Sequence, residues 1–279
     1  MTHLHLSRLQ ARLDTLRASG RKALVPFVTA GDPSLDASVP VMHALVRAGA
    51  DVIELGVPFS DPMADGPVIQ RSSERALARG AGMTYVLECV RAFRELDVAT
   101  PVVLMGYLNP VEIRGPAAFA QAAAEAGVDG VLLVDLPPEE AAEYRAAFAH
   151  HGLALISLAS PTTPEARLQR LCEQSDGYLY YVSFAGVTGA DRLDVGDAGQ
   201  RLRQLRAMGS MPVYAGFGIR DADSARAMAE HADGVVVGSA LVEALAGSCG
   251  SADAAARAHA FLKPLRAALD ALAAGAATA

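Results

Sequence analysis

One acidic residue interrupts an apolar stretch at 51–56, with the sequence DVIELG, and it is the first candidate for chemistry. In an extended strand Val52 and Glu54 would share one face, while Ile53 and Leu55 would share the other. If the apolar pair packs against neighbouring elements, Glu54 points to the opposite side, where burial would raise its pKa toward neutrality. A carboxyl group with such a pKa can transfer protons. The alternative is a structural glutamate paired with an arginine or with backbone amides.

Two more acidic residues follow this strand, in a segment rich in Gly, Pro, Asp and Ser. Asp61 is followed by proline, and Asp65 is followed by glycine. Because Asp-Pro and Asp-Gly pairs are common turn signals, the residues by themselves favour ordinary turns over a catalytic role.

Glycines gather at the ends of two later apolar runs. Gly216 and Gly218 end one run, and Gly238, followed by Ser239, ends the other. Glycine lets backbone amides approach an anion closely, and a short helix starting near Ser239 would add its positive end. The two loops together favour a phosphate site over plain turns.

Several other kinds of chemistry lack the residues they need. The two lysines, Lys22 and Lys263, precede the first apolar run and lie near the C-terminus, which disfavours a Schiff-base lysine at a strand end. The seven histidines form no cluster that resembles a zinc site. The three cysteines are widely spaced, which fits a reducing compartment. We expect no metal and no cofactor in this chain, so carboxylates lead as acid/base candidates.

Alternating strands and helices must position these residues. Helical spacing occurs at 139–150 and 165–174, for example, and separates the β-rich apolar runs. Continuous apolar strands separated by helices predict a parallel sheet covered on its outer face. Eight such units match a (β/α)8 TIM barrel, of class α/β, whereas no GxGxxG follows the first run to support a doubly wound open sheet. The eight runs lie at 23–29, 51–56, 101–107, 130–135, 153–159, 177–183, 212–218 and 234–240.

Two of the eight units are longer than the others. The excess begins directly after strands 2 and 6, at 56–67 and 186–199, where Gly, Asp and other turn-forming residues are frequent. Loops that follow the strand C-termini of a barrel converge on its catalytic face. We therefore expect two long functional loops there.

The N-terminal segment carries leucines at helical spacing, at positions 6, 9, 13 and 16. They predict an amphipathic capping helix over about 2–19, ending near Gly20, followed by the barrel over about 23–276. No Pro/Gly linker divides the sequence, so 1–279 is interpreted as a single domain. The segment has no long apolar core and no cleavage site typical of a targeting peptide, and the expected location is the cytoplasm.

Composition and charge exclude several classes of protein. The chain has 279 residues, of which 52% are hydrophobic and 20% charged, and this excludes disorder. Its net charge of −7 and the lack of a basic patch make nucleic acid a poor partner. No apolar run approaches the roughly 18 residues of a membrane span.

Several segments, taken together, resemble the tryptophan synthase alpha chain family. The most specific is ELGVPFSDPMADGPVIQ at 54–70, which includes both Glu54 and Asp65. The others are PFVTAGDP at 26–33, LMGYLNP at 104–110, GVTGA at 186–190, GFGI at 216–219 and GSA at 238–240. They occur in order across nearly the whole chain.

The resemblance implies a lyase of tryptophan biosynthesis, which cleaves indole-3-glycerol phosphate to indole and glyceraldehyde 3-phosphate by a retro-aldol reaction. Glu54 matches the catalytic acid/base, and Asp65 matches the carboxylate that assists at the indole nitrogen. This overturns the turn interpretation of Asp65. The remaining matches are substrate-binding residues: Phe27, Tyr107 and Tyr180 for indole, Thr188 and Gly189 in a closing loop, and Gly189, Gly216, Gly218, Gly238 and Ser239 around the phosphate.

The sequence departs from the family pattern at one place. Residues 183–185 read SFA where many relatives carry a basic residue, so a loop contact through that charge is in doubt.

The family implies a beta chain that holds pyridoxal phosphate, in an alpha2-beta2 heterotetramer. Candidate interface residues are Pro58, Asp61, Asn109, Asp135 and Pro137. Two alternatives stay open: a stand-alone lyase that releases indole, and an idle subunit that only activates its partner, against which the retention of both carboxylates argues.

Overall fold

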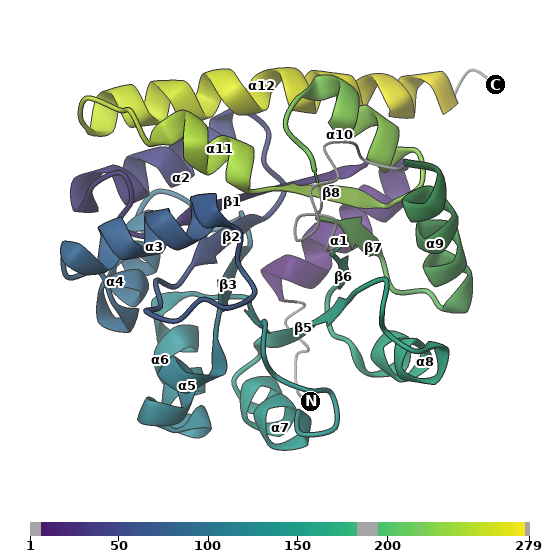
Figure 1. The fold of residues 1–279 in the computed structure, drawn as a ribbon, viewed down its shortest axis with the longest axis horizontal. Helices are drawn as coiled ribbons and strands as arrows, with labels where there is room; N and C mark the ends of the chain where they lie inside the picture. The colour runs from purple at the N-terminus through teal and green to yellow at the C-terminus, as the bar shows by residue number, and fades with distance from the viewer. Residues whose placement is uncertain (1–6, 183–194, 217, 277–279) are drawn as a thin grey trace.

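The computed structural model describes residues 7–182, 195–216 and 218–276 of the chain. Eight parallel strands pair in chain order, and the last pairs with the first, so the sheet closes into a barrel (Figure 1). The strands are β1 Ala23–Thr29, β2 Ile53–Gly56, β3 Val102–Gly106, β4 Gly130–Leu133, β5 Ala154–Ala159, β6 Leu179–Tyr181, β7 Val213–Ala215 and β8 Gly234–Val237. The predicted (β/α)8 barrel is confirmed, and the open sheet is wrong.

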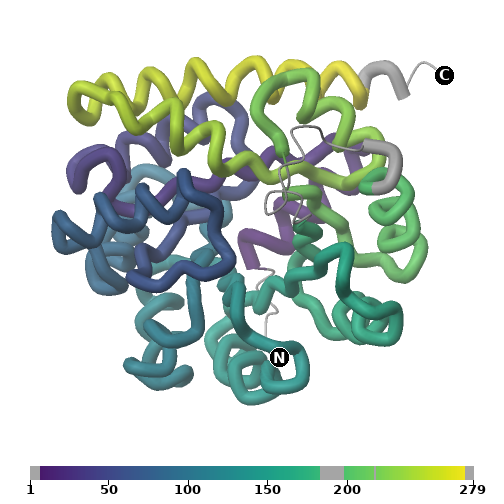
Figure 2. The backbone as a smooth tube through the Cα atoms, viewed as in Figure 1, coloured from purple at the N-terminus to yellow at the C-terminus, as the bar shows by residue number. Residues whose placement is uncertain are grey.

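Helices connect the strands and cover the outside of the barrel (Figures 1 and 2). The long C-terminal helix packs against the second helix of the chain, so the two ends of the sequence close the outer layer. The helices are α1 Arg8–Ser19, η1 Leu35–Ala37 (a 3-10 turn), α2 Ser38–Arg47, α3 Pro67–Ala78, α4 Met83–Arg94, α5 Leu108–Arg114, α6 Pro116–Ala126, α7 Ala142–His150, α8 Glu165–Gln174, α9 Val195–Met208, α10 Ala222–Ala229, α11 Ser239–Leu245 and α12 Ser251–Ala276. None of the described helices is long and apolar enough to cross a membrane.

Helix α1 closes the N-terminal end of the barrel. The Ser7 hydroxyl accepts the Gln10 N–H at its start, and Gly20 ends it in the left-handed conformation with φ 64°. Three buried leucines pack against the inward-facing side chains of the strands; they are Leu9, Leu13 and Leu16. Each leucine buried in this way contributes about 1.5–3 kcal/mol to stability. The predicted capping helix is confirmed over Arg8–Ser19, and residues 1–6 lie outside the described residues.

The two long units differ in part from the prediction. The second unit does contain a loop at 57–66, but much of its extra length is a second helix, α4, whose buried side chains include Val86, Val90 and Phe93. In the sixth unit, residues 195–199 of the predicted loop belong to α9, because this segment continues into the helix ending at Met208. Residues 186–194 lie outside the described residues.

Candidate active site

Glu54 lies in the middle of β2 and points into the barrel. Its neighbours Ile53 and Leu55 face outward into the core beneath the helices, as the alternation predicts. The Glu54 side chain is fully buried at 0% exposure, more deeply than the sequence suggested. The Tyr178 hydroxyl donates to its Oε1 at 2.6 Å, whereas Oε2 has no hydrogen-bond partner among the described residues. Burial raises the pKa of Glu54 to about 7, against the lowering effect of the tyrosine. The carboxyl can therefore give or take a proton near neutral pH.

Tyr178 is a site residue that the sequence reasoning missed. It directly precedes β6, and its ring stacks on that of Tyr214 in β7, with ring centroids 4.4 Å apart. The signal was available, because Tyr178 and Tyr180 are two residues apart and therefore share the inward face of one strand. Both belong to the inward-facing cluster, whereas Tyr181 packs outward.

Asp65 lies in the loop between β2 and α3 and is held by contacts with two side chains. The Tyr107 hydroxyl donates to Asp65 Oδ2 at 3.1 Å and accepts the Ala64 N–H, while the Gln70 amide donates to the Asp65 carbonyl oxygen. Burial raises the pKa of Asp65 to about 6, and the bond from Tyr107 opposes this shift. Asp65 is therefore largely ionised at neutral pH, as an ordinary turn aspartate would be. It differs from such a residue because its carboxylate is held in place and partly desolvated.

A small cavity at the C-terminal ends of β1 to β4 is lined by Asp65, Phe27 and Tyr107 together with Ile69 and Met105. Phe27 is adjacent to Glu54 in the pairing of β1 with β2. The Phe27 ring packs directly on Gly56, where a Cβ atom would lie 2.5 Å from the ring. The wall of this cavity thus has one carboxylate and two aromatic rings.

Tyr180 lies against Gly216, one of the glycines that follow β7. Burial raises the pKa of the Tyr180 hydroxyl well above its usual value, and the negative charges of Glu54 and Asp65 raise it further. This hydroxyl lies where a side chain of Gly216 would project, only 2.2 Å from the position of an added Cβ atom. Gly216 therefore cannot carry a side chain without displacing Tyr180.

The two predicted phosphate loops follow β7 and β8. Gly218 has φ 59°, a conformation that favours glycine, and Phe217 between the two glycines lies outside the described residues. Gly238 precedes α11, which begins at Ser239 as the sequence predicted. A Cβ atom at Gly238 would meet Phe27 at an ordinary 3.6 Å. Thr188, Gly189 and the SFA segment at 183–185 lie outside the described residues.

The candidate interface residues differ in exposure, although all follow strand C-termini. Asp61 and Asn109 are exposed, Asp135 and Pro137 are half-buried, and Pro58 is buried. Asp135 also has a structural contact, since its carboxylate accepts the Leu108 N–H at the start of α5 at 2.8 Å. Two large apolar side chains nearby were not predicted: Met63 in the loop after β2 is 80% exposed, and Ile113 in α5 is 79% exposed.

Among the described residues, no group of three or more His, Cys, Asp or Glu side chains is placed to hold a metal ion. The site instead contains two carboxyl groups with raised pKa values, one at the mouth and one inside a parallel barrel. A (β/α)8 barrel with such a pair is typical of enzymes that use acid–base chemistry.

Comparison with known proteins gives the family. The family model described as "Tryptophan synthase alpha chain" matches residues 13–270. Tryptophan synthase alpha chains of Xanthomonas campestris and Xanthomonas oryzae are both 70% identical to this chain, over 95% of its length and 97% and 99% of theirs. The crystal structure of the alpha subunit from Legionella pneumophila has a TM-score of 0.89 at 46% identity, covering 95% of this chain and 99% of that chain. A tryptophan synthase structure from Mycobacterium tuberculosis has a TM-score of 0.85 at 39% identity, with the same coverage.

The chain belongs to the tryptophan synthase alpha chain family. Its function is that of the family: it is a lyase that cleaves indole-3-glycerol phosphate in tryptophan biosynthesis. Membership also implies a beta chain as partner. The function predicted from the sequence motifs is confirmed.

Proposed function

We propose that Glu54 is the catalytic acid/base of this cleavage and that Asp65 stabilises the positive charge that develops at the indole nitrogen. The observation that carries the assignment is the state of Glu54: a fully buried carboxyl group with a pKa of about 7 and one oxygen that has no hydrogen-bond partner in the described part of the chain. Such a group is ready to exchange a proton with a bound molecule.

The proton balance of a retro-aldol reaction explains why one acid/base suffices. Protonation of indole C3 gives an iminium at the ring nitrogen, and the side-chain hydroxyl then loses its proton. The bond between C3 and the hydroxyl-bearing carbon breaks, its electrons restore the indole ring, and the aldehyde of glyceraldehyde 3-phosphate forms. One proton is used and one is released, so Glu54 ends the cycle as it began. Asp65, ionised and fixed by Tyr107, would lower the energy of the iminium.

Substrate binding is assigned to the two ends of the same site. Phe27, Tyr107 and Tyr180 would contact the indole ring, since Phe27 and Tyr107 line the cavity beside Asp65 and Tyr180 faces the inside of the barrel. The phosphate would lie against the loops that follow β7 and β8, where Gly216, Gly218, Gly238 and Ser239 present backbone amides. Thr188 and Gly189 are assigned to the closing loop by family resemblance.

We also propose how the chain assembles. The family partnership would take the form of an alpha2-beta2 heterotetramer located in the cytoplasm, with pyridoxal phosphate bound by the beta chain. Residues 1–279 would act as one domain. The partner surface would be the rim that carries Pro58, Asp61, Asn109, Asp135 and Pro137; the exposed apolar side chains of Met63 and Ile113 beside it support this location.

The carboxylate roles are tested with Glu54→Gln and Asp65→Asn, which keep shape and remove the charge. Steady-state cleavage by Glu54→Gln should fall by at least about 100-fold while KM changes little, because a proton-transfer group is lost. Asp65→Asn should also lose kcat, because an amide cannot offset the iminium charge.

Two results would contradict these roles. Turnover of Glu54→Gln within about tenfold of the parent would remove Glu54 from proton transfer. A rise in KM alone for Asp65→Asn would make Asp65 a binding residue rather than a catalytic one. A Glu140→Gln variant, at an exposed position of the chain, is the matched control for removing a carboxylate.

A further inference from the structure

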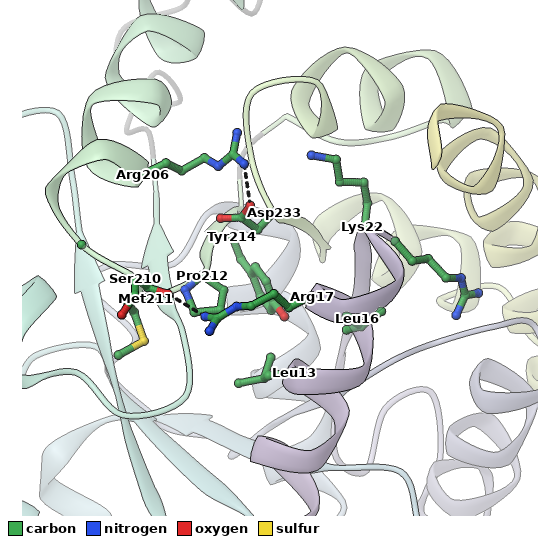
Figure 3. Close-up of a pocket in the computed structure, with 13 residues that line it drawn as sticks. Leu13, Leu16, Arg17, Lys22, Arg206, Ser210, Met211, Pro212, Tyr214 and Asp233 are labelled. Atoms are coloured by element: carbon green, nitrogen blue, oxygen red, sulfur yellow. Dashed lines mark hydrogen bonds and ion pairs between the residues drawn. The ribbon is translucent and has the colours of Figure 1, made fainter. Parts of the chain in front are cut away.

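A second pocket opens at the N-terminal end of the barrel, opposite the candidate active site (Figure 3). It lies where α1 meets the segments that lead into β7 and β8, and its volume is about 400 Å³. Small-molecule sites in proteins typically have volumes of about 300–1,000 Å³. The pocket is therefore large enough for a metabolite-sized ligand and is separate from the two carboxylates.

Positive charge collects in this pocket although the whole chain has a net charge of −7. Its wall contains four basic residues, Arg17, Arg21, Lys22 and Arg206, and one acidic residue, Asp233. Arg206 pairs with Asp233 at 2.9 Å. Arg21 pairs with carboxylates outside the pocket, those of Asp270 at 2.8 Å and Asp51 at 3.3 Å.

The other two basic residues, Lys22 and Arg17, form no ion pair among the described residues. The Lys22 ammonium donates to the Ala232 carbonyl oxygen at 2.7 Å, and the Arg17 guanidinium donates to that of Ser210 at 2.6 Å. An ammonium has three donors and a guanidinium five, so both groups keep donors for a ligand. Figure 3 shows Lys22 and Arg206 extending near Asp233, with Arg17 running along the pocket toward Ser210.

Lys22 is the group that most needs a counter-charge. It is half-buried, and its pKa is lowered first by burial and then by the nearby charge of Arg206, with Asp233 opposing the shift. A bound anion would counter both effects, because it would add negative charge beside the ammonium to that of Asp233.

The rest of the wall defines the ligand's other half. The buried side chains of Leu13 and Leu16 line the pocket together with Met211 and the Tyr214 ring. We propose that this pocket binds a small organic anion, with a carboxylate or phosphate group held by Lys22, Arg17 and Arg206 and a compact apolar body against the half-buried Met211 and Pro212. The Tyr214 ring that lines the pocket is the one stacked on Tyr178, the hydrogen-bond partner of Glu54.

The lysine content of the chain provides a direct test. Lys22 and Lys263 are its only lysines, so protein labelled with 13C at lysine Cε gives two ε-methylene signals, which a Lys263→Arg variant assigns. The full chain is titrated with phenyl phosphate and with benzoate. Separate titrations use inorganic phosphate and phenol, which are the anionic and the aromatic halves of phenyl phosphate. The Lys22 signal should move saturably with at least one organic anion and more weakly with the halves, while the Lys263 signal stays in place.

Variants show whether the pocket itself binds the probe. Arg17→Gln should raise the dissociation constant about tenfold, because one charged hydrogen bond is lost. Arg203→Gln is the matched control: it removes the same charge from an exposed position on α9, outside the pocket. Gly238→Ala, which alters the proposed phosphate loop at the other end of the barrel, should leave the Lys22 response unchanged.

Three outcomes would overturn the proposal. The first is a Lys22 signal that does not respond to either organic anion at millimolar concentration. The second is an Arg17→Gln variant that binds as the parent does. The third is an equal loss in Arg203→Gln, which would show that the probe responds only to overall charge.

Discussion

Glu54 and Tyr178 form a buried pair in which a single hydrogen bond opposes a large effect of burial. Burial favours the neutral carboxyl group, and the tyrosine hydroxyl at 2.6 Å favours the ionised one. The pKa of about 7 is the balance of the two. A change at Tyr178 should therefore alter the pH at which Glu54 acts.

The variant Tyr178→Phe tests this balance. Without the hydroxyl, burial is unopposed and the pKa of Glu54 rises above about 7. Because the proposed first step uses protonated Glu54, the rate should fall as pH rises through that pKa. The alkaline limb of the kcat profile should move upward by about one pH unit. The acid limb, set by ionisation of Asp65 with its pKa of about 6, should stay.

Tyr214→Phe is the control for Tyr178→Phe. It removes the hydroxyl of the stacked neighbour, which does not contact Glu54 in the described structure, and should leave the alkaline limb in place. A parent-like limb in Tyr178→Phe would mean that the hydrogen bond does not set the pKa of Glu54 in the working enzyme.

At the same scale, the local sequence pattern singled out Glu54 as a candidate. It did not single out Asp65 or Tyr178. The alternation of the strand predicts that Glu54 points to the inside once the other face is buried. Asp65 follows no such pattern, because a turn aspartate and a catalytic one have the same local sequence. Its environment depends on Tyr107, which is 42 residues away along the chain. Only tertiary structure, or family resemblance, brings the two together.

Among the elements, the eight strands were predicted well because each is an apolar run separated from the next by helical spacing. Their ends were less accurate: the run at 177–183 contains a strand of only three residues, Leu179–Tyr181. The helix α4 was not separated from the long second unit, although Val86, Val90 and Phe93 have helical spacing. Turn-forming residues just after β2 drew the interpretation toward a loop.

The phosphate loops give a prediction at the scale of elements. Gly238→Ala should fold as the parent does, because the added Cβ meets Phe27 at an ordinary distance. It should nevertheless raise KM for indole-3-glycerol phosphate about tenfold or more, and weaken competition by inorganic phosphate equally, because the methyl group would occupy space near the anion. Thermal unfolding and inhibition by phosphate are the measurements.

Two other glycine variants complete the comparison. Gly216→Ala should lose thermal stability as well as activity, since its side chain would displace Tyr180. Gly82→Ala, where nothing lies within 4 Å of the added atom, should change neither quantity. If Gly238→Ala kept parent KM and phosphate inhibition, the phosphate would have to bind elsewhere.

For the whole molecule, the two ends of the barrel differ in character. The N-terminal end is closed by α1 and carries the basic pocket, whereas the C-terminal end carries both carboxylates and exposes Met63 and Ile113. Large exposed apolar side chains beside an active site are typical of a surface that a partner covers. Indole is a small apolar product, so a partner at this rim would also keep it from escaping into solvent.

Docking of the beta chain should therefore raise the cleavage rate. The expected cause is ordering of the loop at 57–66, which carries both Asp61 and Asp65, so that water is excluded and Asp65 is held at the indole nitrogen. The measurement is the steady-state cleavage rate during titration with beta chain, repeated with Asp61→Ala. This variant should need more beta chain to reach the same rate. Asp14→Ala, an exposed aspartate on α1 at the opposite end, should respond as the parent does. A cleavage rate that does not change with added beta chain would instead favour a stand-alone lyase that releases indole. A parent-like response of Asp61→Ala would show that Asp61 does not belong to the interface.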